Sequence, residues 1–168
     1  MRIEIVNRKQ LLAMIKDNWF NEEYYAVISF YKESEKPLDL SGCKANVLRV
    51  NVEDKINIFE SVFLDSSDQD KVVAKFIMDS LLKGKTIYCQ CLDGKTYSAA
   101  CAAAIYEYFL GIGLVVFADK DYHPDRLMFN RIYYALRDAR VFMTTEQINA
   151  IFPFNRQIDE RALISQIM

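Results

Sequence analysis

The chain has 168 residues, of which 52% are hydrophobic, and it contains 11 Phe and 10 Tyr; this composition supports a packed core and excludes an intrinsically disordered chain. The formal net charge is -2, with acidic and basic residues interspersed, which argues against a nucleic-acid partner. No run approaches the roughly 18 uninterrupted apolar residues of a membrane span, so we expect no membrane partner. The start does not resemble a signal peptide, so we expect a cytoplasmic protein. The length predicts one domain over residues 1–168.

The first third of the chain predicts one helix followed by two strands. Asn7 and Gln10 form a helix start signal for residues 8–16, whose apolar positions have helical spacing. The stretches 24–30 and 45–52 are rich in β-branched and aromatic residues, and a turn-prone stretch separates them. Both stretches are therefore predicted to be strands.

The middle of the chain predicts a helix, a strand and a second helix. Ser66 or Ser67 can cap a helix in which apolar residues recur every three or four positions until Gly84. A short, mostly apolar strand is predicted at 86–91, and an alanine-rich helix at 98–110. A strand, a loop and a helix therefore follow one another in this region.

The last third of the chain predicts further helices. Pro124 fits the first turn of a helix that continues through Leu136. Thr144 and Gln147 form a capping-box pattern, and a last helix is predicted around 158–167. Strands that alternate with helices predict an α/β fold, with a central, mostly parallel sheet flanked by helices and with binding sites at the carboxyl ends of the strands.

The loop between the predicted strand and the alanine-rich helix has the features of a phosphate-binding element. Cys91 ends the strand, Gly94 follows three residues later, and Ser98 opens the helix. A strand that turns sharply into a helix directs backbone N–H groups and the positive end of the helix dipole at one point, which favours an oxyanion and a thiolate. Gly94 permits a positive φ or a close backbone approach, and the Ser98 hydroxyl can donate to the Cys91 sulfur.

This loop resembles the signature loop of the cysteine-dependent protein tyrosine and dual-specificity phosphatases, His-Cys-x5-Arg-Ser/Thr. The segment RVNVED (49–54) is similar to the strand and acid-bearing turn of that family, and the helix near 68–83 to the approach to its loop. The segment YHPDRLMFNRIYYAL (122–136) is similar to its closing helix. The resemblance covers about residues 45–137 and implies a phosphatase-like fold with its phosphate-binding strand-loop-helix at 86–110.

The resemblance also implies roles for individual residues. Cys91 matches the nucleophile that attacks phosphorus, and Asp54 matches the acid that protonates the leaving oxygen, with Glu60 or Asp65 as substitutes. Water then hydrolyses the phosphocysteine, and neither a cofactor nor a metal is implied. The implied partners are phosphate, a phosphorylated protein or a small phosphate monoester. The residues matched to the phosphate-binding loop are Leu92, Asp93, Gly94, Lys95, Thr96, Tyr97 and Ser98.

Two positions depart from the signature. Tyr97 replaces the arginine whose planar fork binds two phosphate oxygens, and Gln90 replaces the histidine. By analogy with arginine fingers, loss of such a clamp slows phosphoryl transfer by about 10³- to 10⁵-fold. We therefore expect a catalytically impaired phosphatase-like protein that binds phosphate or a phosphorylated partner. A weakly active phosphatase that uses Lys95 as a substitute cation is an alternative.

The cysteines leave one more alternative open. Cys89 lies two residues before Cys91, so both side chains should face the same side of the strand, where Cys89 fits a core position. Cys89 or Cys101 could resolve a sulfenic acid on Cys91 as a disulfide, which would make the chain a thiol redox or structural interaction module. Together with the single His123, these three cysteines lack the spacing of a metal site, because Cys-x-Cys has no matching second pair.

Overall fold

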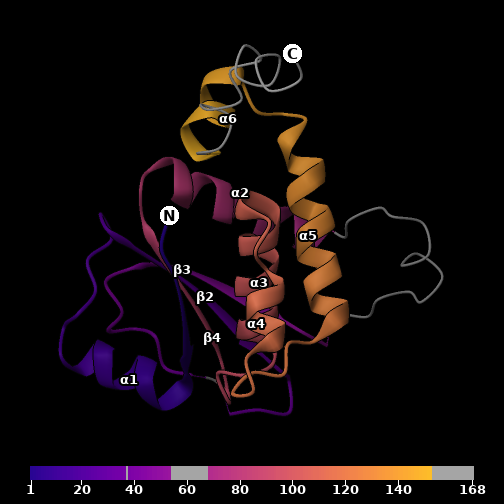
Figure 1. Cartoon of the computed structure of the whole chain (residues 1–168). Coiled ribbons are helices and arrows are strands. Elements are labelled where there is room, and N and C mark those ends of the chain that lie inside the picture. The colour runs from indigo at the N-terminus through magenta and orange to yellow at the C-terminus, as the bar shows by residue number, and fades with distance from the viewer. Residues whose placement is uncertain (37, 54–67, 153–168) are drawn as a thin grey trace, which may run out of the picture.

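The computed structural model describes residues 1–36, 38–53 and 68–152 (Figure 1). Four strands form one parallel sheet in the order β1-β4-β2-β3. In this sheet, Asn7 pairs with Cys91, so the ends of β1 and β4 lie side by side. The parallel sheet confirms the expected α/β class. The strands are β1 (Ile3–Asn7), β2 (Tyr25–Tyr31), β3 (Asn46–Asn51) and β4 (Thr86–Cys91).

One asparagine ends the first strand and begins the first helix. Helix α1 (Arg8–Lys16) starts with the predicted capping box. The Asn7 side chain accepts from the Gln10 amide at 2.9 Å, and the Gln10 side chain accepts from the Asn7 amide at 2.8 Å. Strand β1 is not among the sequence predictions, because its five residues are short for a periodicity signal and run directly into the helix start.

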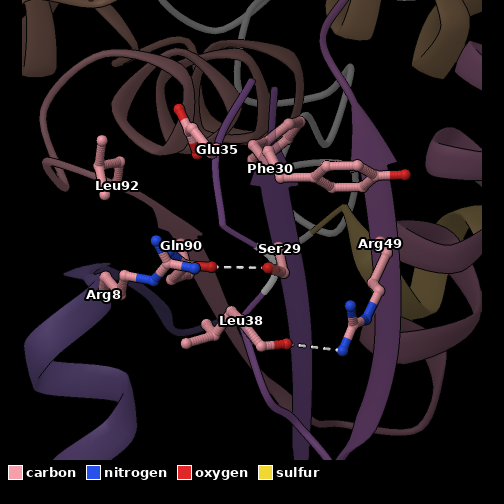
Figure 2. Close-up of a pocket in the computed structure, with 9 residues that line it drawn as sticks. Arg8, Ser29, Phe30, Glu35, Leu38, Arg49, Gln90 and Leu92 are labelled. Atoms are coloured by element: carbon pink, nitrogen blue, oxygen red, sulfur yellow. Dashed lines mark hydrogen bonds between the residues drawn. The ribbon is translucent and has the colours of Figure 1, made fainter. Parts of the chain in front are cut away.

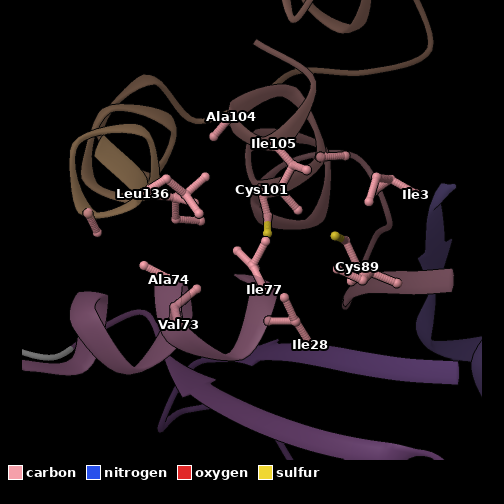
Figure 3. Close-up of a cluster of buried hydrophobic side chains, with 14 of the residues drawn as sticks. Ile3, Ile28, Val73, Ala74, Ile77, Cys89, Cys101, Ala104, Ile105 and Leu136 are labelled. Atoms are coloured by element: carbon pink, nitrogen blue, oxygen red, sulfur yellow. The ribbon is translucent and has the colours of Figure 1, made fainter. Parts of the chain in front are cut away.

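Helices cover both faces of the sheet (Figure 1). On one face α2 (Asp68–Leu82), α3 (Tyr97–Leu110) and α5 (Arg126–Arg140) share a buried cluster with the strands. In Figure 3, Cys101 from α3 and Ile77 from α2 point toward one another beside the sheet. On the other face, Leu11 of α1 packs with Val27 and Tyr88. The central strands are therefore buried on both faces, which explains why they are almost continuously apolar.

Helix α3 packs through small side chains. Ala99, Ala100 and Ala102–Ala104 have no exposed surface, as the alanine-rich sequence predicts. Small residues let a helix axis approach the sheet closely, and this fixes the helix start relative to the end of β4. The helix ends at Gly111, which has a left-handed φ of 68°.

The predicted place of Pro124 is wrong. Asp125 is the N-cap of α5 and accepts from the Met128 amide at 2.7 Å, so the helix begins after the proline and not around it. The capping side chain decides the boundary here, since it satisfies an amide at the helix start. Helix α4 (Leu114–Ala118) has only five residues and is not among the sequence predictions.

The capping box of Thr144 and Gln147 is present at the start of α6 (Thr145–Ile151). The predicted cap at Ser66 or Ser67 and the predicted helix at 158–167 lie outside the described residues. Within the described ranges, no helix has both the length and the apolar character needed to cross a bilayer.

Candidate functional site

The predicted loop connects β4 to α3 at the carboxyl end of the sheet. Gly94 has a φ of 69°, and a Cβ atom at this position would lie 2.7 Å from the backbone nitrogen of Asn7. Only glycine combines this conformation with this approach. The Arg8 amide also donates to the Leu92 carbonyl at 3.4 Å. The loop is therefore seated against the junction of β1 and α1, and the predicted need for glycine is confirmed.

The sulfur of Cys91 lies inside this loop and is almost covered, because the residue is 2% exposed. The Ser98 Oγ lies 3.0 Å from the sulfur, which agrees with the predicted contact. The thiol also donates to the Asp93 Oδ1 at 3.0 Å. An ionised carboxylate can only accept, so this hydrogen bond uses the thiol proton.

The carboxylate of Asp93 accepts several hydrogen bonds from other residues of the loop. Its Oδ1 also accepts from the Lys95 amide at 2.8 Å and from the Thr96 amide at 3.2 Å, and its Oδ2 accepts from the Thr96 hydroxyl at 2.7 Å. Partial burial raises the pKa of Asp93, but the hydrogen bonds from Cys91, Lys95 and Thr96 outweigh it and lower the pKa from 3.8 to about 2. Asp93 is therefore an anion at neutral pH.

Tyr97, which the sequence resemblance matches to the signature arginine, is the first residue of α3. The ammonium of Lys32, which directly follows β2, lies 5.7 Å from the centre of the Tyr97 ring. A cation over an aromatic face is attracted by the ring quadrupole. The carboxyl end of the sheet thus holds a positive charge beside the residue that replaces the arginine, although a single ammonium lacks the bidentate geometry of a guanidinium.

Gln90, which the sequence resemblance matches to the signature histidine, faces the opposite side of β4 from Cys91, because neighbouring strand residues point in opposite directions. Its side-chain oxygen accepts from the Ser29 hydroxyl at 2.6 Å (Figure 2). Gln90 also lines a cavity of about 190 Å³, together with Arg8 and Leu92. The polar contact of Gln90 therefore joins β4 to β2 on the face that carries α1.

The segment 123–125, which precedes α5, contacts the loop through backbone hydrogen bonds. The His123 amide donates to the Lys95 carbonyl at 3.0 Å, and the Asp125 amide donates to the Thr96 carbonyl at 3.4 Å. The Lys95 residue is exposed, with its amide bound to Asp93. His123 thus reaches the loop through its main chain.

The other candidate residues are placed as follows. Asp54, Glu60 and Asp65 lie outside the described residues, so the acid stays a prediction. Cys89 is fully buried in the same cluster as Cys101, as Figure 3 shows, which confirms its predicted core position. Burial raises the pKa of Cys101 well above its usual value, and the neighbouring Cys89 raises it further. In the described part of the chain, no three His, Cys, Asp or Glu side chains form a potential metal site.

Sequence reasoning missed the roles of Lys32 and of the Asp93 side chain. Lys32 directly follows β2 and is far from the loop in the sequence, so no local pattern connects the two. Asp93 is predicted only as part of the phosphate-binding backbone. Its position two residues before an amide that needs an acceptor is typical of an Asx turn, and this signal could have revealed its contacts.

Neither a family model nor a curated protein sequence matches the chain. Among solved structures, the crystal structure of Tk-PTP in the active form has a TM-score of 0.52 at 15% identity, and the match covers 85% of this chain and 94% of that chain. The crystal structure of PTPMT1 has a TM-score of 0.48 at 11% identity, and the match covers 83% of this chain and 92% of that one. At these identities the likeness concerns the fold. Together with the parallel sheet, the match to Tk-PTP shows that this chain has the same α/β fold as Tk-PTP.

Proposed function

We propose that this chain is a catalytically impaired phosphatase-like domain that binds phosphate or a phosphorylated partner at the loop of residues 91–98. The convergence of two loop amides, a hydroxyl and a thiol on one carboxylate is the observation that carries the proposal. A loop that directs its donors at one anion has the geometry to hold another, and the start of α3 adds the positive end of a helix dipole. The Lys32 ammonium adds further positive charge at the same edge of the sheet.

Impaired catalysis follows from the groups at the reacting position. Phosphoryl transfer depends on stabilising the charge of the transferred group, and Tyr97 cannot supply the charged fork of an arginine. The missing clamp corresponds to about 10³- to 10⁵-fold in rate. In addition, the Cys91 sulfur lies 3.0 Å from the Asp93 Oδ1, so a carboxylate stands beside the atom that would have to face phosphorus. Binding of a phosphoryl group without efficient turnover is the function that these contacts support best.

Titration of inorganic phosphate and of phosphotyrosine into the ¹⁵N-labelled protein tests the binding. We expect saturable shifts of the amide resonances of residues 92–98, because these donors surround the anion position. Ser98→Pro removes one amide and the hydroxyl that contacts Cys91, and it should weaken binding by about tenfold, which is the size of one charge-assisted hydrogen bond. The resonances of β2 report whether this variant is folded. Equal affinity of the wild type and a folded Ser98→Pro variant would contradict the proposal.

A weakly active phosphatase is the second candidate function. The ammonium of Lys32 beside Tyr97 favours it, because this cation could partly replace the missing charge. Cys91 would then form the phosphocysteine, and hydrolysis would require both residues. The choice between the two functions depends on whether any turnover depends on Cys91.

A further inference from the structure

We propose that Asp93 is a built-in competitor for the anion site, so that a phosphate group binds at this loop only when the Asp93 side chain swings out. The inference rests on the proposed function, since it takes the loop of residues 91–98 as the phosphate site. It adds a residue that controls access to this site and sets its affinity.

The Asp93 carboxylate occupies the hydrogen-bond donors that a phosphate group would need. The amides of Lys95 and Thr96 follow the loop glycine and lie just before the first turn of α3, where backbone donors have no partner within the helix. Both of them donate to Asp93 Oδ1, and the Thr96 hydroxyl donates to Oδ2. A phosphate oxygen cannot accept from these donors while the carboxylate holds them. The carboxylate thus stands where a phosphate oxygen would bind.

The Asp93 carboxylate also carries a negative charge, as a phosphate group does. The low pKa of Asp93, about 2, keeps the carboxylate ionised at neutral pH. Its Oδ1 also accepts from the Cys91 thiol at 3.0 Å, so the negative charge lies next to the sulfur that a bound phosphate would face. Two anions at contact distance repel each other, and more strongly near a protein surface than in bulk water. A phosphate dianion and the inward-facing carboxylate therefore exclude one another.

The Asp93 side chain can rotate out of the loop into solvent. Asp93 is an exposed residue, whereas Cys91 and Ser98 on either side of the anion position are buried. Rotation of the Asp93 side chain into solvent breaks its hydrogen bonds in the loop but moves no core residue. The amides of Lys95 and Thr96 and the thiol of Cys91 would then lose their contact with the carboxylate. Displacement is therefore a local event, and its cost is subtracted from the affinity for phosphate.

Titration of inorganic phosphate into wild type, Asp93→Ala and Asp39→Ala tests this inference by isothermal calorimetry or amide shifts. Asp39 is a matched control, because it is also exposed and its Oδ1 accepts from a following amide, that of Ser41, at 2.9 Å. We expect Asp93→Ala to bind phosphate at least about tenfold more tightly than wild type, since donors are freed and a like charge is removed. Asp39→Ala removes the same charge from the chain and should stay within about twofold of wild type.

The outcomes separate this inference from the proposed function. If wild type binds phosphate and Asp93→Ala binds no more tightly, the competitor role is wrong and the binding function stands. If neither protein binds phosphate, both fail. Should Asp93→Ala not fold, Asp93→Asn decides, because it keeps the shape and one acceptor oxygen but removes the charge. A tighter phosphate complex of Asp93→Asn supports the competitor role, and an unchanged affinity overturns it.

Discussion

An aryl phosphate should be hydrolysed at least about 100-fold faster by the double variant Tyr97→Arg with Asp93→Ala than by the wild type, because the charged clamp alone is worth about 10³- to 10⁵-fold in related phosphoryl transfers. The introduced guanidinium would stand at the start of α3, where it can bind two phosphate oxygens with its planar fork. Removal of the Asp93 carboxylate frees the amides of Lys95 and Thr96 and the thiol of Cys91. Both changes act on the same bound phosphoryl group.

The single variants separate the two contributions. Tyr97→Arg alone should raise the hydrolysis rate, but by less than the double variant, because an ionised carboxylate inside the loop offers the new guanidinium a competing partner. Asp93→Ala alone frees donors of the loop but supplies no clamp, so it should raise the rate by less than Tyr97→Arg does. Steady-state rates of all four proteins therefore form a double-mutant cycle with a positive coupling. A folded double variant with the wild-type rate would show that the loop cannot position a phosphoryl group for attack.

The second large effect concerns the folding of the loop. Gly94→Ala should lower the free energy of unfolding by about 3 kcal/mol, the sum of a left-handed conformation and a steric overlap. The overlap arises because the added Cβ would lie 2.7 Å from the Asn7 nitrogen, which belongs to the backbone and cannot rotate away. Since Asn7 also caps α1, the strain would reach the helix start as well. Denaturant titration followed by circular dichroism measures the loss.

Gly84→Ala is the matched control for this change. Gly84 has the same φ of 69°, but an added Cβ would have no atom within 4 Å. It therefore carries only the conformational cost, about 1 kcal/mol. The difference between the two variants isolates the contact of the loop with Asn7. Equal losses of stability in both variants would mean that this contact does not hold the loop.

The sequence predicts those parts of the fold that depend on neighbouring residues. The capping boxes at Asn7 and Thr144 bind amides three residues away, so their patterns are complete within a few residues. The same is true of Gly94 and of the contact between Cys91 and Ser98, because the spacing of the loop brings them together. Strand, loop and helix at 86–110 are therefore predicted with nearly correct boundaries.

The remaining features depend on residues that are far apart in the chain or on a choice between acceptors. Strand β1 is too short to be recognised until it pairs with β4. Lys32 meets Tyr97 only because β2 and β4 are neighbours in the sheet. The sequence spacing places Asp93 in the loop between β4 and α3, but it does not state whether its side chain or a bound phosphate accepts from the amides. That choice depends on the geometry of the folded loop.

The central claim, a phosphatase fold that has lost efficient turnover, is tested most directly by steady-state hydrolysis of an aryl phosphate. Wild type and Cys91→Ser are compared under reducing conditions at mildly acidic and neutral pH, with Lys32→Ala to report on the substitute cation. We predict that the wild-type rate does not exceed that of Cys91→Ser, because the Asp93 carboxylate lies beside the Cys91 sulfur and Tyr97 supplies no charged clamp. A wild-type rate that Cys91→Ser abolishes and Lys32→Ala lowers would contradict the claim and make this chain an enzyme.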